Sequence, residues 1–235
     1  MDFAPEGPMA IPMWVNGRAY LSVGDRFFNV VNPVSGEAVR RVPLCGAAEA
    51  AEAVTAAQAA QPQWAAMGMP ARRVCIQALA DGLERYRGHF AKLLQQDLGL
   101  ADEAATAEVD AAVAALRSDL VGQAGFVSGV FGLVVGAERP LSRFAAAIAP
   151  LLLAGGTLTV KPSPQAPSAV FALCELSSRC DWPGGVLNLV QGDKDAIDGL
   201  CRAGIERLLF TGEAGLGAQV VALADAAGIA CDLLG

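Results

Sequence analysis

A lysine directly after an apolar run is the first candidate for ligand chemistry in this chain. Lys161 follows residues 157–160, opens the segment Lys161-Pro162-Ser163, and is one of three lysines in 235 residues. A cation at the end of a buried strand could hold a ribose or a phosphate. The alternative is a surface lysine that ends a strand, and the residues alone leave both interpretations open.

A glycine-rich turn ahead of a helical pattern is the second candidate. Residues 210–217 read FTGEAGLG, and backbone N–H groups of Gly212, Gly215 and Gly217 could face an anion at a helix N-terminus. Glu213 opposes this, because a carboxylate about 4 Å from a unit anion costs roughly 1 kcal/mol in water and about 4 kcal/mol at an effective dielectric of about 20. Glu213 also has a purely structural interpretation, since a glutamate stabilises a helix N-terminus.

Acid–base, nucleophilic and metal chemistry find little support among the other residues. Glu138 and Glu213 could act as paired carboxylates, but nothing in the sequence fixes their separation. The one histidine, His89, falls in a helical region away from the predicted turns, so no Ser-His-Asp or Cys-His set can be assembled. The six cysteines form no CxxC pair, which argues against a metal site and favours buried free thiols. A reactive thiol stays an alternative.

The elements that must position these turns alternate between strand and helix from residue 129 onward. Apolar runs predict strands at 130–135, 157–161, 186–190, 206–210 and 229–234, separated by helices at 141–153, 166–180, 194–203 and 215–226. This alternation predicts an α/β fold with a Rossmann-like parallel sheet and helices on both faces. Ligands of such sheets bind at the carboxyl ends of the strands, where both candidate turns fall.

The first half of the chain predicts a different organisation. Residues 13–44 show short apolar runs broken by Asn16-Gly17 and by a turn at 33–36, which predicts an N-terminal β-hairpin or three antiparallel strands. An Ala-rich helix from residue 47, closed by Pro62, precedes helices at about 71–87, 89–97 and 102–116. We therefore divide the chain into 1–128, a strand and helix segment, and 129–235, the Rossmann-like domain, and expect one compact unit.

Composition limits the classes of partner. A net charge of −7 without a long basic run argues against nucleic acid. The longest apolar stretch, 144–160, is interrupted by proline and glycine and is shorter than the roughly 20 residues of a membrane span. With no recognisable secretory leader, we expect a cytoplasmic protein. Hydrophobic residues make up 54%, which implies either an unusually large core or an apolar surface that a partner covers.

Segments along nearly the whole chain resemble the aldehyde dehydrogenase superfamily. They follow in the family's order: WVNGRAY and FNVVNPVSGEAVRRVPL, then GVFGLVV, APLLLAGGTLTVKPSP, WPGGVLNLVQG, RLLFTG and CDLLG. The resemblance implies the family's fold and an NAD(P) site at the strand ends. Of the residues that form this cofactor site in the family, this sequence clearly keeps Lys161 and Gly217. Ser163, Gly212 and Glu213 stand at neighbouring positions of the same site.

Departures from the family pattern imply that the site is vestigial. Glu138 stands where the family has an asparagine that helps to hold the substrate oxyanion, and losing one such donor costs about 3–4 kcal/mol. Pro164 replaces a glutamate that contacts the adenosine ribose, and Glu213 replaces a serine that contacts the pyrophosphate. The family's Glu-Leu-Gly-Gly general-base motif is shortened to Asp232-Leu233-Leu234-Gly235.

Two further departures concern whole segments. No residue of this sequence corresponds to the catalytic cysteine, which lies in a further domain of family members. Residues 118–128 are also too short for the family's usual oligomerisation hairpin.

We therefore expect a catalytically inactive, aldehyde dehydrogenase-like protein lacking the catalytic cysteine domain, similar to truncated domains of long bifunctional proline-utilisation enzymes. It would act as a structural, assembly or regulatory partner of a full-length dehydrogenase or of itself. NAD(P) binding would be weak or absent. The alternatives are a module that still binds NAD(P) weakly, a dehydrogenase subunit that takes its nucleophile from another chain, and a decayed fragment without function.

Overall fold

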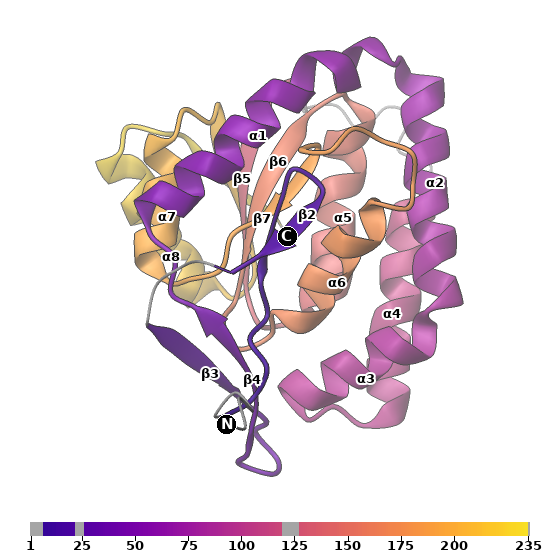
Figure 1. Cartoon of the computed structure of the whole chain (residues 1–235), viewed down its shortest axis with the longest axis vertical. Helices are drawn as coiled ribbons and strands as arrows, with labels where there is room; N and C mark the ends of the chain where they lie inside the picture. Colours follow the sequence, from indigo (N-terminus) through magenta and orange to yellow (C-terminus); the bar gives the residue numbers. More distant parts are fainter. Residues whose placement is uncertain (1–6, 22–25, 119–126, 235) are drawn as a thin grey trace, which may run out of the picture.

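A mixed sheet forms the centre of the molecule (Figure 1). The computed structural model describes residues 7–21, 26–118 and 127–234. Its strands are β1 (Met13–Val15), β2 (Arg18–Tyr20), β3 (Phe27–Val31), β4 (Ala38–Pro43), β5 (Val130–Val135), β6 (Thr157–Pro162), β7 (Leu187–Leu189), β8 (Arg207–Thr211) and β9 (Cys231–Leu234). Seven of them form one sheet in the order β2-β1-β7-β6-β5-β8-β9, and β3 pairs with β4 separately.

The sheet confirms the predicted parallel α/β architecture and extends it. Strands β5 to β9 pair in parallel, as the strand–helix alternation predicts. The hairpin β1–β2 joins the same sheet, because β1 pairs antiparallel with β7 at Trp14 and Leu189. The N-terminal hairpin therefore completes one edge of the Rossmann-like sheet.

Helices cover both faces of this sheet (Figure 1). They are α1 (Ala47–Ala66), α2 (Met69–Arg85), α3 (Arg87–Leu98), α4 (Asp102–Arg117), α5 (Pro140–Leu153), α6 (Ser168–Ser177), α7 (Lys194–Arg202) and α8 (Ala214–Ala226). Helices α1, α7 and α8 lie on one face, and α5 and α6 lie on the other, with α2, α3 and α4 packed outside them.

The predicted end of the first helix at Pro62 is wrong, because α1 continues to Ala66. A proline inside a helix removes one backbone hydrogen bond and costs about 3 kcal/mol. Here a contact with another helix stabilises the last turn of α1. The fully buried Trp64 donates from Nε1 to the carbonyl of Leu152 at 3.0 Å, which ties the end of α1 to the end of α5.

A buried arginine joins the same two helix ends. Arg72 of α2 is 7% exposed, and its guanidinium donates to the carbonyls of Ala65 at 2.8 Å and Leu153 at 3.0 Å. The last carbonyls of a helix lack partners within the helix, so a donor from a neighbouring helix satisfies them. Burial lowers the pKa of Arg72, but these acceptors suit its charged form.

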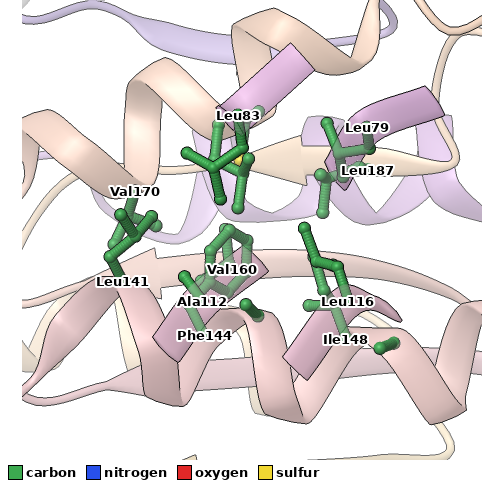
Figure 2. Close-up of a cluster of buried hydrophobic side chains, with 14 of the residues drawn as sticks. Leu79, Leu83, Ala112, Leu116, Leu141, Phe144, Ile148, Val160, Val170 and Leu187 are labelled. Atoms are coloured by element: carbon green, nitrogen blue, oxygen red, sulfur yellow. The ribbon is translucent and has the colours of Figure 1, made fainter. Parts of the chain in front are cut away.

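The larger core lies between the sheet and the helices of the α5–α6 side (Figure 2). Side chains from both predicted segments of the chain share it. Figure 2 shows Leu79 and Leu83 of α2 and Phe144 of α5 near Val160 of β6 and Leu187 of β7. Successive side chains of β5 point to opposite faces of the sheet. Phe131 and Leu133 lie in this cluster, and Val130 and Val134 lie in the cluster on the other face.

Candidate cofactor and substrate site

The carboxyl ends of β5 and β8 bring two predicted turns into backbone contact. The N–H of Gly136 donates to the carbonyl of Thr211 at 2.8 Å. Gly212 has a φ of +150°, and a Cβ added to it would meet the Cα of Gly136 at 3.0 Å. A side chain at Gly212 would strain the backbone and clash with the β5–α5 turn. The close approach of the two turns therefore requires a glycine at this position.

The β5–α5 turn carries two charged side chains, Glu138 and Arg139, and each pairs with a residue of a neighbouring helix. Glu138, the predicted vestigial catalytic position, forms an ion pair with Arg143 at 3.1 Å. Arg139 has a left-handed backbone, φ 49°, and its Nε lies 3.5 Å from a carboxylate oxygen of Glu108. The turn therefore presents a carboxylate and a guanidinium where the family resemblance implies a side-chain amide.

Glu108 of α4 occupies the N-terminus of α5. Its side chain is buried, and it accepts hydrogen bonds from the backbone N–H and the hydroxyl of Ser142, both at 2.9 Å. The positive end of a helix dipole and a free backbone donor favour an anion at this place. Here a side chain of the protein itself is that anion.

An open groove of about 530 Å³ lies between α4 and this turn. Its walls are mostly apolar, with Leu98, Leu100 and Pro140 among the residues that line it. Glu108, Glu138 and Arg139 supply its charge. The groove lies beside the position at which a substrate oxyanion is expected from the resemblance.

Lys161 lies buried at the end of β6. It is 5% exposed, and within the described part of the chain its amine makes no hydrogen bond or ion pair. Burial lowers the pKa of this amine to about 8, while the charge of Asp193 acts in the opposite direction. Ser163 is also buried, and its hydroxyl accepts from the N–H of Gln165 at 3.3 Å.

The β8–α8 turn differs from the predicted anion cradle. The N–H of Gly217 donates to the carbonyl of Glu213 at 3.0 Å inside α8, so it is not directed at a ligand. A Cβ on Gly217 would meet the Phe210 ring at 3.0 Å, which explains this glycine by packing. Glu213 is exposed and stands at the N-cap of α8 without a side-chain cap bond.

Asp232, the other vestigial catalytic position, lies in β9 and forms an ion pair with Arg207 of β8 at 2.8 Å. Leu209 is its neighbour in the sheet register. Gly235, which ends the predicted general-base motif, lies outside the described residues. The same holds for residues 119–126 of the segment that we consider too short for an oligomerisation hairpin.

The thiols of this chain are held in their protonated form. Five of the six cysteines are buried, and Cys231 is half-buried. Desolvation raises the pKa of every one, to about 11 for Cys180 and Cys201 and to about 12 for Cys45. Across the ranges that the structure describes, no three His, Cys, Asp or Glu side chains gather as a metal site, and no helix has the length and hydropathy to cross a membrane.

Two buried carboxylates cap helices, and neither was predicted from the sequence as a site residue. Besides Glu108, Asp97 of α3 is 3% exposed and accepts from the N–H and hydroxyl of Ser168, at 2.9 and 2.8 Å, at the start of α6. The sequence does contain a sign that these two carboxylates are buried. Each carboxylate falls within an apolar stripe of its helix, beside Val109 in α4 and Leu94 in α3.

The fold is that of the Rossmann-like α/β class, whose members bind their ligands at the carboxyl ends of the parallel strands, and the turns described above gather at that edge. The model of the aldehyde dehydrogenase family matches residues 20–125 and 126–233, so the chain belongs to this family, as its motifs predict.

Curated relatives and solved structures agree with this membership. An N-succinylglutamate 5-semialdehyde dehydrogenase of Salmonella heidelberg (strain SL476) is 32% identical over an aligned length of 227 residues, and the match covers 88% of this chain and 46% of the relative. A putative methylmalonate-semialdehyde dehydrogenase from Sinorhizobium meliloti 1021, solved with NAD, superposes with a TM-score of 0.90 at 24% identity, covering 98% of this chain and 51% of that one. A mutant aldehyde dehydrogenase C from Pseudomonas syringae, solved with NAD+ and octanal, superposes with a TM-score of 0.87 at 25% identity. The superposition covers 95% of this chain and 50% of that one. The chain thus spans about half the length of the relatives it matches.

Proposed function

We propose that this chain does not oxidise aldehydes by itself and that it serves as a structural or assembly partner, of a full-length dehydrogenase or of a second copy of itself. The charge arrangement of the β5–α5 turn carries the first half of this proposal. Glu138 is held by Arg143, and Glu108 already occupies the N-terminus of α5. The turn position and the helix N-terminus, two places where a donor could stabilise an oxyanion, therefore hold carboxylates.

The energetic consequence is large. One donor to an oxyanion contributes about 3–4 kcal/mol to the transition state. A carboxylate about 4 Å from the same oxyanion costs roughly 4 kcal/mol at an effective dielectric of about 20. Arg139 offsets part of this repulsion, but its side chain is 61% exposed and its Nε faces Glu108. The turn thus favours the ground state over a developing oxyanion.

The thiols support the same conclusion. Covalent aldehyde oxidation needs a thiolate nucleophile, and low-pKa thiols owe their charge to neighbouring cations or helix N-termini. Burial raises the pKa of each of the six thiols here. Cys231, the most accessible, has Asp232 and Asp225 near it, and both carboxylates raise its pKa further.

One of the two edges of the sheet, formed by β9, supports the assembly half of the proposal. Strand β9 pairs with β8 on one side, and within the described residues its other side has no partner strand. Leu233 on this strand is 59% exposed. An unpaired strand edge with an exposed apolar side chain is a template for a partner chain.

Two measurements test this function. The purified chain and the variant Glu138→Asn are assayed for NADH formation with aliphatic aldehydes and semialdehydes, and we expect none from either. NADH formation by the purified wild-type chain would refute the inactive assignment. Tagged protein isolated from its native cell is then sized, and its companions are identified by mass spectrometry. A dehydrogenase at fixed stoichiometry, or a homodimer, supports the assembly role, whereas a lone monomer contradicts it.

A matched pair of variants locates the interface. Leu233→Lys on β9 should abolish the complex or the dimer, because a charge would replace the exposed apolar side chain at the strand edge. Val34→Lys, at a position that is 79% exposed away from β9, serves as the control and should leave the assembly intact. Equal behaviour of the two variants would place the interface elsewhere.

Lys161 favours a second candidate, a module that still binds a nucleotide. A buried amine without a partner in the described residues costs stability, and such a group is common at binding sites. Titration with NAD and NADP tests this candidate. A dissociation constant below about 100 μM, lost in Lys161→Met, would establish it, and no saturable binding would exclude it.

A further inference from the structure

A second groove, of about 380 Å³, lies between α3 and α6, away from the strand ends. Phe90, Ala172 and Leu176 line it with apolar atoms, and Tyr86, His89, Glu175 and Arg179 supply its polar groups. Its volume falls in the range of about 300–1,000 Å³ that small-molecule sites show. Nothing in the function proposed above uses it.

The two charged side chains of this groove do not pair with each other. Glu175 lies in the last turn of α6, and Arg179 lies two residues beyond the end of this helix at Ser177, and both line the groove. Arg179 turns instead to Tyr86: its Nη1 donates to the phenol oxygen at 2.8 Å, and its guanidinium carbon lies 5.5 Å from the ring centroid. Within the described residues, the carboxylate of Glu175 has no hydrogen bond or ion pair.

The groove therefore presents one unpaired carboxylate, one guanidinium with donors left over, and an apolar floor. Phe90 and Leu176 are 2% and 7% exposed, so the floor is anchored in the core. A guanidinium binds a carboxylate in a charge-assisted hydrogen bond, and a carboxylate binds an ammonium in the same way. A carboxylate and a guanidinium in the same groove match a small molecule that carries both an ammonium and a carboxylate.

We propose that this groove binds an α-amino acid with an apolar side chain. The ligand's carboxylate meets Arg179 and its ammonium meets Glu175. Its side chain packs on Ala172 and on the small exposed parts of Phe90 and Leu176. A smaller cavity of about 190 Å³ shares His89, Ala172 and Glu175 and extends the groove toward Phe171 and Leu93. This extension gives room for a branched or aromatic side chain.

Calorimetric titration of the full chain with L-leucine tests the proposal. Three analogues separate the contributions: 4-methylpentanoate lacks the ammonium, 3-methylbutylamine lacks the carboxylate, and glycine lacks the apolar side chain. Because each removes one of the matched contacts, each should bind at least about tenfold more weakly than leucine. Absence of saturable leucine binding up to about 10 mM would overturn the proposal. Equal affinity for 4-methylpentanoate would overturn it too, because the groove would then be a simple anion site.

Matched variants place the binding in this groove. Glu175→Gln and Arg179→Gln should each weaken leucine binding about tenfold or more, and both residues are exposed, so the fold should persist. Arg202→Gln, an exposed arginine of α7, is the control and should bind leucine like the wild type. Urea unfolding of all three variants verifies the fold. If leucine binds and neither groove variant changes its affinity, the ligand lies elsewhere and the proposal is wrong.

Discussion

The carboxylate of Glu108 on α4 accepts two hydrogen bonds from Ser142 on α5, one from the backbone N–H and one from the hydroxyl, both at 2.9 Å. Asp97 on α3 makes the same pair of bonds to Ser168 at the start of α6. In both cases the helical first half of the chain supplies the anion for the N-terminus of a helix of the Rossmann-like half. The two halves are therefore joined by polar contacts as well as by a shared core.

Replacing the α5 cap should destabilise the protein. In Glu108→Gln the amide oxygen can still accept from the Ser142 N–H and the NH2 group can donate to the hydroxyl oxygen, but the charge at the helix N-terminus and both charge-assisted hydrogen bonds are lost. We expect the free energy of unfolding to fall by about 1–3 kcal/mol, as measured by urea denaturation. Glu103→Gln, at an exposed position in the first turn of the same α4, is the control and should change stability much less. Equal losses would show that the Ser142 bonds contribute nothing specific.

The α6 cap should make stability depend on pH. Burial raises the pKa of Asp97 to about 6 from its ordinary 3.8, so the folded state holds its proton to higher pH than the unfolded state. Between about pH 4 and pH 6 this contribution to stability therefore decreases as pH rises, by up to about 3 kcal/mol in total. Urea denaturation of the wild type and Asp97→Asn at several pH values measures the effect. The wild type should lose stability relative to the variant over this interval, and parallel curves would contradict the assignment.

Two glycines of α8 should respond oppositely to alanine. Gly215 has no atom within 4 Å of an added Cβ, so Gly215→Ala should stabilise the protein by about 0.5–1 kcal/mol through helix propensity. Gly217→Ala would place its Cβ 3.0 Å from the Phe210 ring, and the clash should cancel that gain or reverse it. Thermal unfolding of both variants compares them directly. Equal stabilisation would mean that the Phe210 ring moves aside at no cost.

The buried lysine should trade stability against ligand binding. The folded-state pKa of Lys161 is about 8, below its ordinary 10.5, so the protonated amine destabilises the fold at neutral pH and the cost is relieved as pH rises from about 8 to about 10.5. Lys161→Met should therefore be more stable than the wild type at about pH 7, by up to about 3 kcal/mol, and the gap should narrow toward pH 9. Urea denaturation at both pH values measures this. A less stable variant would show that the amine has a stabilising partner in the fold.

Much of the fold could be predicted from the sequence, because local patterns determine it. The strand–helix alternation after residue 129 places β5 correctly at 130–135, and α5 begins one residue before its predicted start. The family motifs predicted the membership that the comparisons confirm. The helix end predicted from Pro62 was wrong, because the hydrogen bond from Trp64 that holds the last turn of α1 goes to the carbonyl of Leu152, far away in the sequence.

The candidate site depended on tertiary structure. The sequence by itself determined which residue types stand at the strand ends: a carboxylate at Glu138, an amine at Lys161 and glycines near residue 212. Only the fold decided that Glu138 pairs with Arg143 and that Glu108 caps the N-terminus of α5. The fold also decided that the N–H of Gly217 donates to a carbonyl of its own helix and not to a ligand. The physical reason is that charge pairing and desolvation depend on which distant elements lie within a few ångströms, and periodicity along one chain does not encode those distances.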